Sequence, residues 1–232
     1  MNIVVCLHAP PPDANGPGLG RDDAHALAQG VALATADRRN DPLTALLAGT
    51  IAESGPLQRA LAASASRAVR LTGEDFSGAD FHLVGQTLAT GIKRLGADLV
   101  LTGARSDDEG LGAVPASTAR HLGFICVSGV EEVARAADGA AAVEVVVRGG
   151  GKKRRLRVEL PAVLSVVAGP RALPAVPERT ANPSDVEVLS LSDPEATVVR
   201  RRTEFLGRPE TASRGTEEVA SAEAFVAALA RR

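Results

Sequence analysis

The sequence predicts an α/β fold: an open, mostly parallel sheet with helices on both faces, followed by an antiparallel hairpin region and a C-terminal arm. Three observations favour this fold. Short runs rich in Val, Ile and Leu alternate with longer helix-like segments through the first half of the chain, a pattern typical of parallel sheets covered on both faces. Strand-length runs separated by glycine turns come next, and beyond residue 170 prolines become frequent.

Composition sets the broad class. With 232 residues, of which 45% are hydrophobic, the chain can bury a substantial core in one large domain. Aromatic residues make up only 2%, which argues against a base-stacking surface for nucleic acid, and a net charge of -2 gives no field that attracts DNA or an acidic membrane. No run approaches the roughly 20 apolar residues of a membrane span, so we expect a cytoplasmic protein with no span.

The first elements follow from apolar runs and breakers. Residues 2–7 form a continuous apolar run, which predicts a buried strand. A loop rich in Pro and Gly, residues 9–20, separates this strand from a helix that reaches about residue 36, with Asp23 expected as its N-cap. Further strands are expected at 43–48, 67–71 and 98–102, and further helices at 56–64, 80–95 and from 113 to about 121.

The hairpin region contains strands expected at 124–134, 142–147 and 153–159. The basic run Lys-Arg-Arg-Leu-Arg at 153–157 resembles a nucleic-acid patch at first sight. Strand side chains alternate between two faces, and Glu144 and Glu159 lie nearby, so we interpret the run as a solvated edge strand.

The remaining chain divides into a last strand and a tail. Residues 162–168 predict a final buried strand. We assign residues 1–190 to one α/β domain and residues 191–232 to an arm that packs on a partner and ends in a short amphipathic helix at 222–230.

No residue pattern predicts catalysis or a metal. Cys6 and Cys126 each lie in an apolar run and are expected to be buried strand thiols. The four histidines are scattered, without a pair spaced for metal on one helix face. There is no Gly-x-Ser-x-Gly elbow and no evident nucleophile–His pairing, so we expect neither catalytic residues nor a metal site.

The most informative segment runs from Gly103 to Pro115, between a predicted strand and a predicted helix. Its glycines let the backbone approach a ligand, and N–H groups at the helix start can meet a phosphate; a tight turn without a ligand is the alternative. The segment is neither a Walker A loop nor a G-x-G-x-x-G fingerprint. We interpret Asp107-Asp108-Glu109 as a solvated cluster at the helix entry and not as a metal site.

The order and spacing of these segments resemble the beta subunit of electron transfer flavoproteins. The resemblance rests on the following residues: Leu46–Gly49, Arg59–Ala63, Arg67–Leu71, the run Leu-Gly-Ala-Asp-Leu-Val-Leu-Thr-Gly at 95–103, His121–Phe124, Leu160–Val166, Pro170-Arg171 and Val188–Leu191. No single motif is very specific, but the shared order covers nearly the whole chain and is clearest over residues 43–191.

The resemblance implies an adenine nucleotide alpha-hydrolase-like fold, with residues 1–190 as the nucleotide-binding domain. It also implies a heterodimer with an alpha subunit that holds most of an FAD, while the beta subunit buries AMP and passes electrons from flavin dehydrogenases toward the respiratory chain without being an enzyme. The resemblance further implies that Val176 occupies the partner-docking position. The implied cofactor-binding residues are Cys6, Asp22, Asp23, Ala48, Gly103, Ala104, Arg105, Ser106, Asp107, Asp108, Glu109, Gly110, Leu111, Gly112, Ala113 and Val114.

Two other functions compete with this one. A divergent nucleotide-binding scaffold or signalling protein of the same fold, lacking flavin, is the alternative. A hydrolase or ATP-dependent ligase comes last, because loop 9–20 has no Ser or Thr to grip a phosphate. The chain also departs from the family at Ala113-Val114-Pro115, where Gln-Thr/Val-Gly is usual, so AMP, a second FAD and no nucleotide all remain open.

Overall fold

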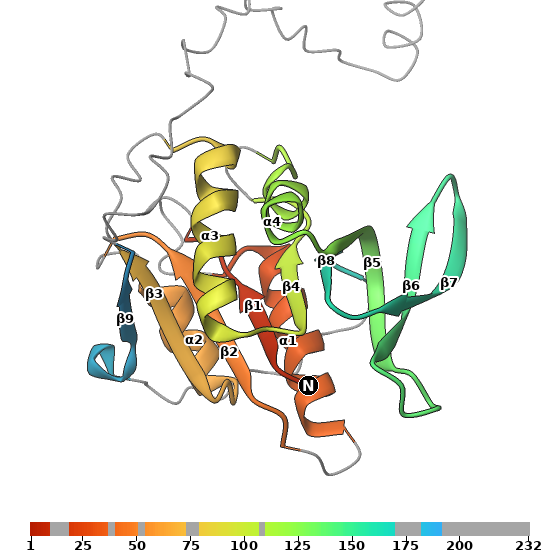
Figure 1. The fold of residues 1–232 in the computed structure, drawn as a ribbon, viewed down its shortest axis with the longest axis horizontal. Coiled ribbons are helices and arrows are strands. Elements are labelled where there is room, and N and C mark those ends of the chain that lie inside the picture. The colour runs from red at the N-terminus through yellow and green to blue at the C-terminus, as the bar shows by residue number, and fades with distance from the viewer. Residues whose placement is uncertain are drawn as a thin grey trace, which may run out of the picture.

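The computed structural model describes residues 1–9, 19–36, 40–50, 54–72, 79–106, 110–169 and 182–191. Within them, one nine-stranded sheet has the order β7-β6-β5-β8-β4-β1-β2-β3-β9 (Figure 1). The strands are β1 (Ile3–Cys6), β2 (Leu43–Ala48), β3 (Arg67–Thr72), β4 (Leu99–Gly103), β5 (Ile125–Arg135), β6 (Ala142–Gly149), β7 (Lys152–Glu159), β8 (Ala162–Val166) and β9 (Glu187–Ser190). The helices are α1 (Arg21–Thr35), α2 (Gly55–Ala62), α3 (Phe81–Leu95) and α4 (Val114–Leu122), with a 3-10 turn at Pro183–Asp185.

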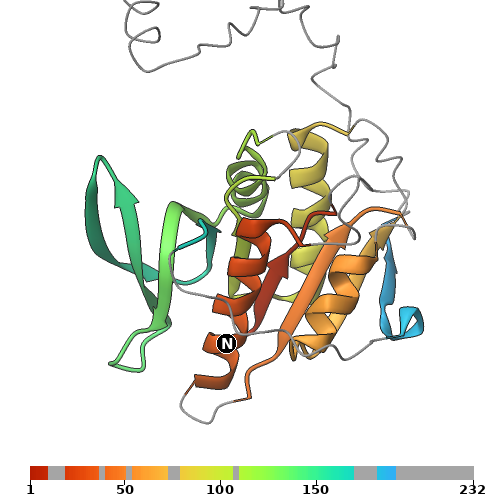
Figure 2. The same cartoon turned by 180° about the vertical axis from the view of Figure 1, so that it is seen from behind.

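Helices cover both faces of the sheet. All neighbouring strands are parallel except the pairs β5–β6 and β6–β7. Helices α1 and α2 pack on one face and α3 and α4 on the other (Figures 1 and 2). Strand β1 shows the reason, because Ile3 and Val5 enter the core beneath α1 and α2, whereas Val4 and Cys6 enter the opposite core. The predicted open, mostly parallel sheet is therefore confirmed.

Helix α3 shows how local sequence sets the boundaries. The Asp80 carboxylate accepts the backbone N–H of His82 at 3.1 Å and of Leu83 at 2.8 Å, which satisfies two free donors of the first turn. Gly96 ends the helix in the left-handed conformation, with φ 64°. Between these caps, Leu88 and Ile92 are buried against the sheet. The helix expected at residues 80–95 is therefore confirmed.

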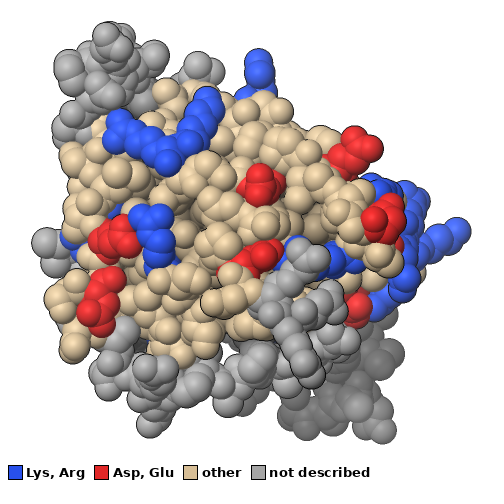
Figure 3. Space-filling view, turned by 60° about the horizontal axis from the view of Figure 1, so that its bottom comes forward, with Lys and Arg blue, Asp and Glu red and all other residues tan. Residues whose placement is uncertain are grey.

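The β6–β7 hairpin extends past the helical layers (Figures 1 and 2). Strand β7 is the sheet edge, and its basic side chains are exposed. Lys and Arg gather at this end of the molecule (Figure 3). Several are paired: Glu131 of β5 binds Arg148 and, at 2.9 Å, Lys153. The solvated edge strand is confirmed.

One cysteine prediction is wrong. Cys6 is buried, as expected, but Cys126 is exposed. Strand β6 pairs with β5 only from Val130 onward, so the first residues of β5 have β8 on one side and no described strand on the other. Ile125, which precedes Cys126, is 50% exposed for the same reason.

Strand β9 is an element that the sequence did not predict as a strand. It pairs in parallel with β3 at the opposite edge from β7. Arg67 of β3 donates to both carboxylate oxygens of Glu187 at 2.9 and 2.7 Å, which fixes the two strands side by side. The proposed domain boundary falls after β9; residues 192–232, including the helix expected at 222–230, lie outside the described residues.

Across the described part of the chain, no helix combines the length and the apolar character that a bilayer crossing requires.

Candidate functional site

The chain changes direction across the sheet between β1 and β4. From β1 it passes to β2 and β3 on one side, and β4 then returns to pair with the other side of β1. The chain therefore leaves the carboxyl ends of the neighbouring strands β1 and β4 in opposite directions. In open α/β sheets, ligands bind in the crevice at such a switch point.

A cavity of about 310 Å³ occupies this crevice. Its size falls at the lower end of the roughly 300–1,000 Å³ that is typical of small-molecule sites. The ends of β1, β2 and β4, the start of α3 and the segment that enters α4 surround it. Of the predicted cofactor-binding residues, the following line it: Cys6, Asp23, Ala48, Gly103, Ala104, Arg105, Ser106, Leu111, Gly112, Ala113 and Val114.

The other predicted site residues do not line the cavity or lie outside the described residues. Asp22 does not line the cavity; its carboxylate accepts the N–H of Ala168 at 2.8 Å and ties the start of α1 to the segment after β8. Gly110 is also outside the lining, and its N–H donates to the Ser106 hydroxyl at 3.3 Å. The remaining predicted residues, Asp107, Asp108, Glu109 and Val176, lie outside the described residues.

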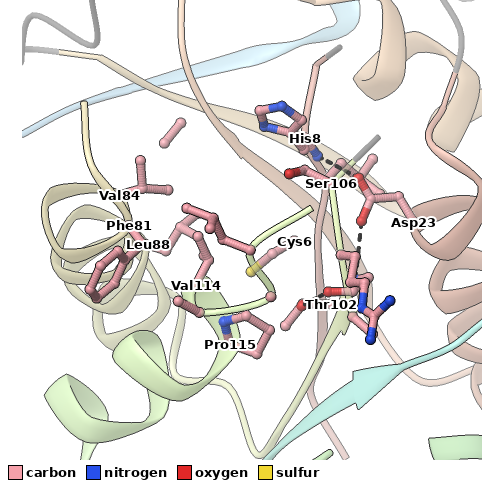
Figure 4. Close-up of a pocket in the computed structure, with 18 of the residues that line it drawn as sticks. Cys6, His8, Asp23, Phe81, Val84, Leu88, Thr102, Ser106, Val114 and Pro115 are labelled. Carbon is pink, nitrogen blue, oxygen red and sulfur yellow. Dashed lines mark hydrogen bonds between the residues drawn. The ribbon is translucent and has the colours of Figure 1, made fainter. Parts of the chain in front are cut away.

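Asp23 joins the two strands that border the crevice. Its Oδ2 accepts the N–H of His8 at 2.8 Å, and its Oδ1 accepts the N–H of Gly103 at 3.1 Å (Figure 4). The N-cap predicted for Asp23 is wrong, because α1 begins at Arg21 with Gly20 as its N-cap. The carboxylate lies in the first helical turn, where it accepts hydrogen bonds from residues after β1 and at the end of β4 and does not cap its own helix.

Gly103 allows β4 to approach α1. A Cβ at this position would lie 2.2 Å from Oδ1 and 2.9 Å from the backbone nitrogen of Asp23, and such distances are not sterically possible. The close approach at Gly103 is therefore to the protein's own helix. Gly112, with φ +64°, lies equally close to the backbone, since a Cβ there would be 2.9 Å from the Ala104 carbonyl oxygen.

The cavity has an apolar side and a polar side. Phe81, Val84 and Leu88 of α3 form one side, and His8 and Ser106 lie across from them (Figure 4). A flat apolar ring can pack on the first side while polar groups of the same ligand face the second. The sequence did not predict that α3 side chains line the cavity. The one indication was that the apolar stripe of this helix continues to its first residue, Phe81.

Burial and charge act together on the cavity floor. Burial raises the pKa of the Cys6 thiol well above its ordinary value, and the negative charge of Asp23 raises it further. The thiol therefore stays protonated, and the negative charge of Asp23 acts on Cys6 at the cavity floor.

Helix α4 points its N-terminus toward the same cavity. Ala113 is its N-cap and makes no side-chain capping bond, and Pro115 has no backbone N–H. The first turn thus contributes backbone N–H groups and the positive end of the helix dipole, but no hydroxyl or amide side chain from residues 113–115. Among the described residues, no group of three His, Cys, Asp or Glu could hold a metal ion.

Known proteins share this chain's sequence pattern. The family model described as electron transfer flavoprotein domain matches residues 16–194. The electron transfer flavoprotein subunit beta of Clostridium acetobutylicum is 35% identical over 148 residues, which are 57% of this chain and 56% of that protein. Protein FixA of Azorhizobium caulinodans is 28% identical over 141 residues, or 59% of this chain and 50% of that protein.

A third relative agrees with these two. The electron transfer flavoprotein subunit beta of Methylophilus methylotrophus is 28% identical over 141 residues, covering 59% of this chain and 53% of that protein. The chain spans about half the length of the curated relatives it matches. Since the family model covers residues 16–194, which include every described element from α1 to β9, this chain belongs to the electron transfer flavoprotein domain family and resembles its beta-type members.

Proposed function

We propose that the chain is the beta-type subunit of an electron transfer flavoprotein. In this role it binds AMP in the switch-point cavity and pairs with an alpha subunit that holds most of an FAD. The pair passes electrons from flavin dehydrogenases toward the respiratory chain, in the cytoplasm, and this chain is a carrier subunit and not an enzyme. The observation that carries the proposal is the two-sided cavity between β1 and β4 in a member of this family.

The residues present fit a purine mononucleotide. Val84 and Leu88 offer an apolar surface for the base, and the start of α4 offers its positive end to a phosphate. Both Asp23 oxygens already accept backbone N–H groups, so this carboxylate keeps the cavity in shape before a ligand arrives. A cavity of about 310 Å³ suits one mononucleotide better than a dinucleotide, which favours AMP over a second FAD.

The flavin supplies the electron-carrying chemistry when it is bound. This chain contributes binding and orientation: AMP stabilises the carboxyl edge of the sheet, and the surface of the domain holds the flavin-bearing partner. Docking to dehydrogenases through Val176 belongs to the same proposal.

The alternative is a nucleotide-binding scaffold or signalling protein without flavin. One observation favours it: the entry to α4 has Ala113-Val114-Pro115, where the family usually has Gln-Thr/Val-Gly, so the Gln side chain is lost. That change weakens the usual phosphate contacts and points to altered ligand binding.

Purification of the assembled complex tests the proposal. The full chain is co-expressed with a candidate alpha subunit from the same genome, and the purified material is examined by absorbance and by chromatography of acid-released nucleotides. We expect a yellow complex that releases both FAD and AMP and whose flavin is reduced by a flavin dehydrogenase in the presence of that dehydrogenase's substrate. A colourless chain that purifies without partner or nucleotide would rule the proposal out, and a colourless chain that carries a nucleotide would support the scaffold.

A further inference from the structure

We propose that Arg105 selects a phosphorylated ligand for the cavity, by placing its guanidinium on the phosphate while the base lies against α3. This inference rests on the proposed binding of an adenine nucleotide and adds the residue that distinguishes the nucleotide from its nucleoside.

The position of Arg105 supports this role. It follows β4 by two residues and lines the cavity. A Cβ on Gly112 would lie 3.6 Å from Cγ of Arg105, so the aliphatic stem of the arginine runs beside the segment that enters α4. The side chain is exposed, and within the described residues it forms no hydrogen bond or ion pair. A guanidinium beside the cavity is therefore available to an anion.

Arg105 supplies a fixed positive charge to the cavity lining. No other Arg or Lys among the described residues lines it. Helix α4 contributes only its dipole and backbone N–H groups, because Ala113 and Val114 are apolar and Pro115 has no N–H. A guanidinium binds a phosphate through two parallel hydrogen bonds and thus supplies contacts that the side chains of Ala113, Val114 and Pro115 do not.

Charge on the floor sets the orientation of the ligand. Asp23 is buried at the inner end and its negative charge reaches Cys6, so a phosphate placed there would be repelled. Arg105 lies at the solvent-exposed side, where a phosphate is attracted and stays partly hydrated. The base then takes the inner position against Val84 and Leu88, and the phosphate points outward.

Titration calorimetry of the full chain with AMP and with adenosine tests this assignment. Four proteins are compared: the native chain, Arg105→Gln, Arg105→Lys and Arg154→Gln. Arg154 is a matched control, since it is an exposed arginine on the β7 edge without a partner among the described residues. We expect Arg105→Gln to weaken AMP binding by at least about tenfold and to change adenosine binding by less than about twofold.

Two further readouts separate charge recognition from a structural effect. AMP affinity of the native chain should fall as salt rises, and that salt dependence should become shallower in Arg105→Gln, while Arg105→Lys restores part of the affinity. If Arg105→Gln binds AMP as well as the native chain, or loses AMP and adenosine equally, the assignment is overturned and AMP binding itself still stands. If the native chain binds neither compound, the proposed nucleotide function is overturned as well.

Discussion

Asp23 and Gly103 are separated by 80 residues in sequence, yet the carboxylate of the first accepts the N–H of the second at 3.1 Å. The other oxygen of Asp23 accepts the N–H of His8. One buried side chain therefore holds the ends of β4 and β1 at the spacing that opens the cavity. The carboxylate acts on the shape of the site, whereas Arg105 is proposed to act on the charge of the ligand.

Replacement of Asp23 by Asn should destabilise the fold. Asn retains one oxygen acceptor but presents an NH₂ group to the second backbone N–H, so one partly buried donor loses its partner. We expect the free energy of unfolding to fall by about 1–3 kcal/mol, measured by urea denaturation. Glu132→Gln on β5 is the control, because Glu132 is exposed and its side chain has no partner among the described residues, and its midpoint should stay near that of the native chain. An unchanged midpoint in Asp23→Asn would show that the two bonds carry no net stability.

Gly103→Ala should be harmful for a steric reason. The added Cβ would meet Asp23 at 2.2 Å from Oδ1 and 2.9 Å from the backbone nitrogen, so α1 has to move away from β4. We expect a loss of about 1–3 kcal/mol in thermal unfolding, with weakened AMP binding because the cavity wall shifts. Gly149→Ala is the matched control, since a Cβ there has no atom within 4 Å. Equal melting temperatures for the two variants would contradict the close packing of α1 on β4.

Strands in the middle of the sheet were predictable because their sequence is apolar throughout. Strand β1 and strand β8 are buried on both faces, and a short, nearly continuous run of apolar residues bounded by turn residues is typical of such strands. The strands at the edges of the sheet were harder to predict. Strand β9 is four mostly exposed residues held by Arg67, and the exposure of Cys126 depends on where β6 stops pairing, which is a property of distant segments.

The candidate site was predictable where it is made of backbone. The segment after β4 stands out through its glycines and its position between a strand and a helix. The α3 wall could not be predicted, because Val84 and Leu88 follow the same helical spacing whether they pack on the sheet or face a ligand. The sequence predicts a local capping role for Asp23, because an acidic residue at a helix start is typical of a cap, and it carries no sign of a bond to a residue 80 positions away.

Acid should weaken the hairpin through Glu131. The hydrogen bond from Arg148 and then that from Lys153 lower the pKa of Glu131 from its ordinary value of 4.5, against a smaller opposing effect of burial. Because the pKa is depressed in the folded state, the stabilisation is complete above about pH 5 and disappears as the pH falls through the lower folded-state value.

Urea midpoints measured from pH 7 to pH 3 check this. The native chain should lie above Glu131→Gln at neutral pH, and the two curves should converge at the acid end. Glu144→Gln on the same hairpin is the control, because the ion pair that Glu144 forms with Arg155 is exposed and long, at 3.8 Å. A constant gap between the native chain and Glu131→Gln at every pH would contradict the ion-pair explanation.

Thiol labelling should distinguish the two cysteines. Cys126 is exposed at the start of β5, whereas Cys6 is buried beneath the cavity, and burial raises the pKa of both thiols, far more for Cys6. Since the thiolate is the reactive form, the folded chain should react with a disulfide reagent at Cys126 alone, and more slowly than a free thiol at pH 7. Cys126→Ser should abolish the reaction until urea unfolds the chain, when Cys6 becomes accessible. Rapid labelling of folded Cys126→Ser would show that the cavity floor opens to solvent, and saturating AMP should then slow that labelling if the nucleotide covers Cys6.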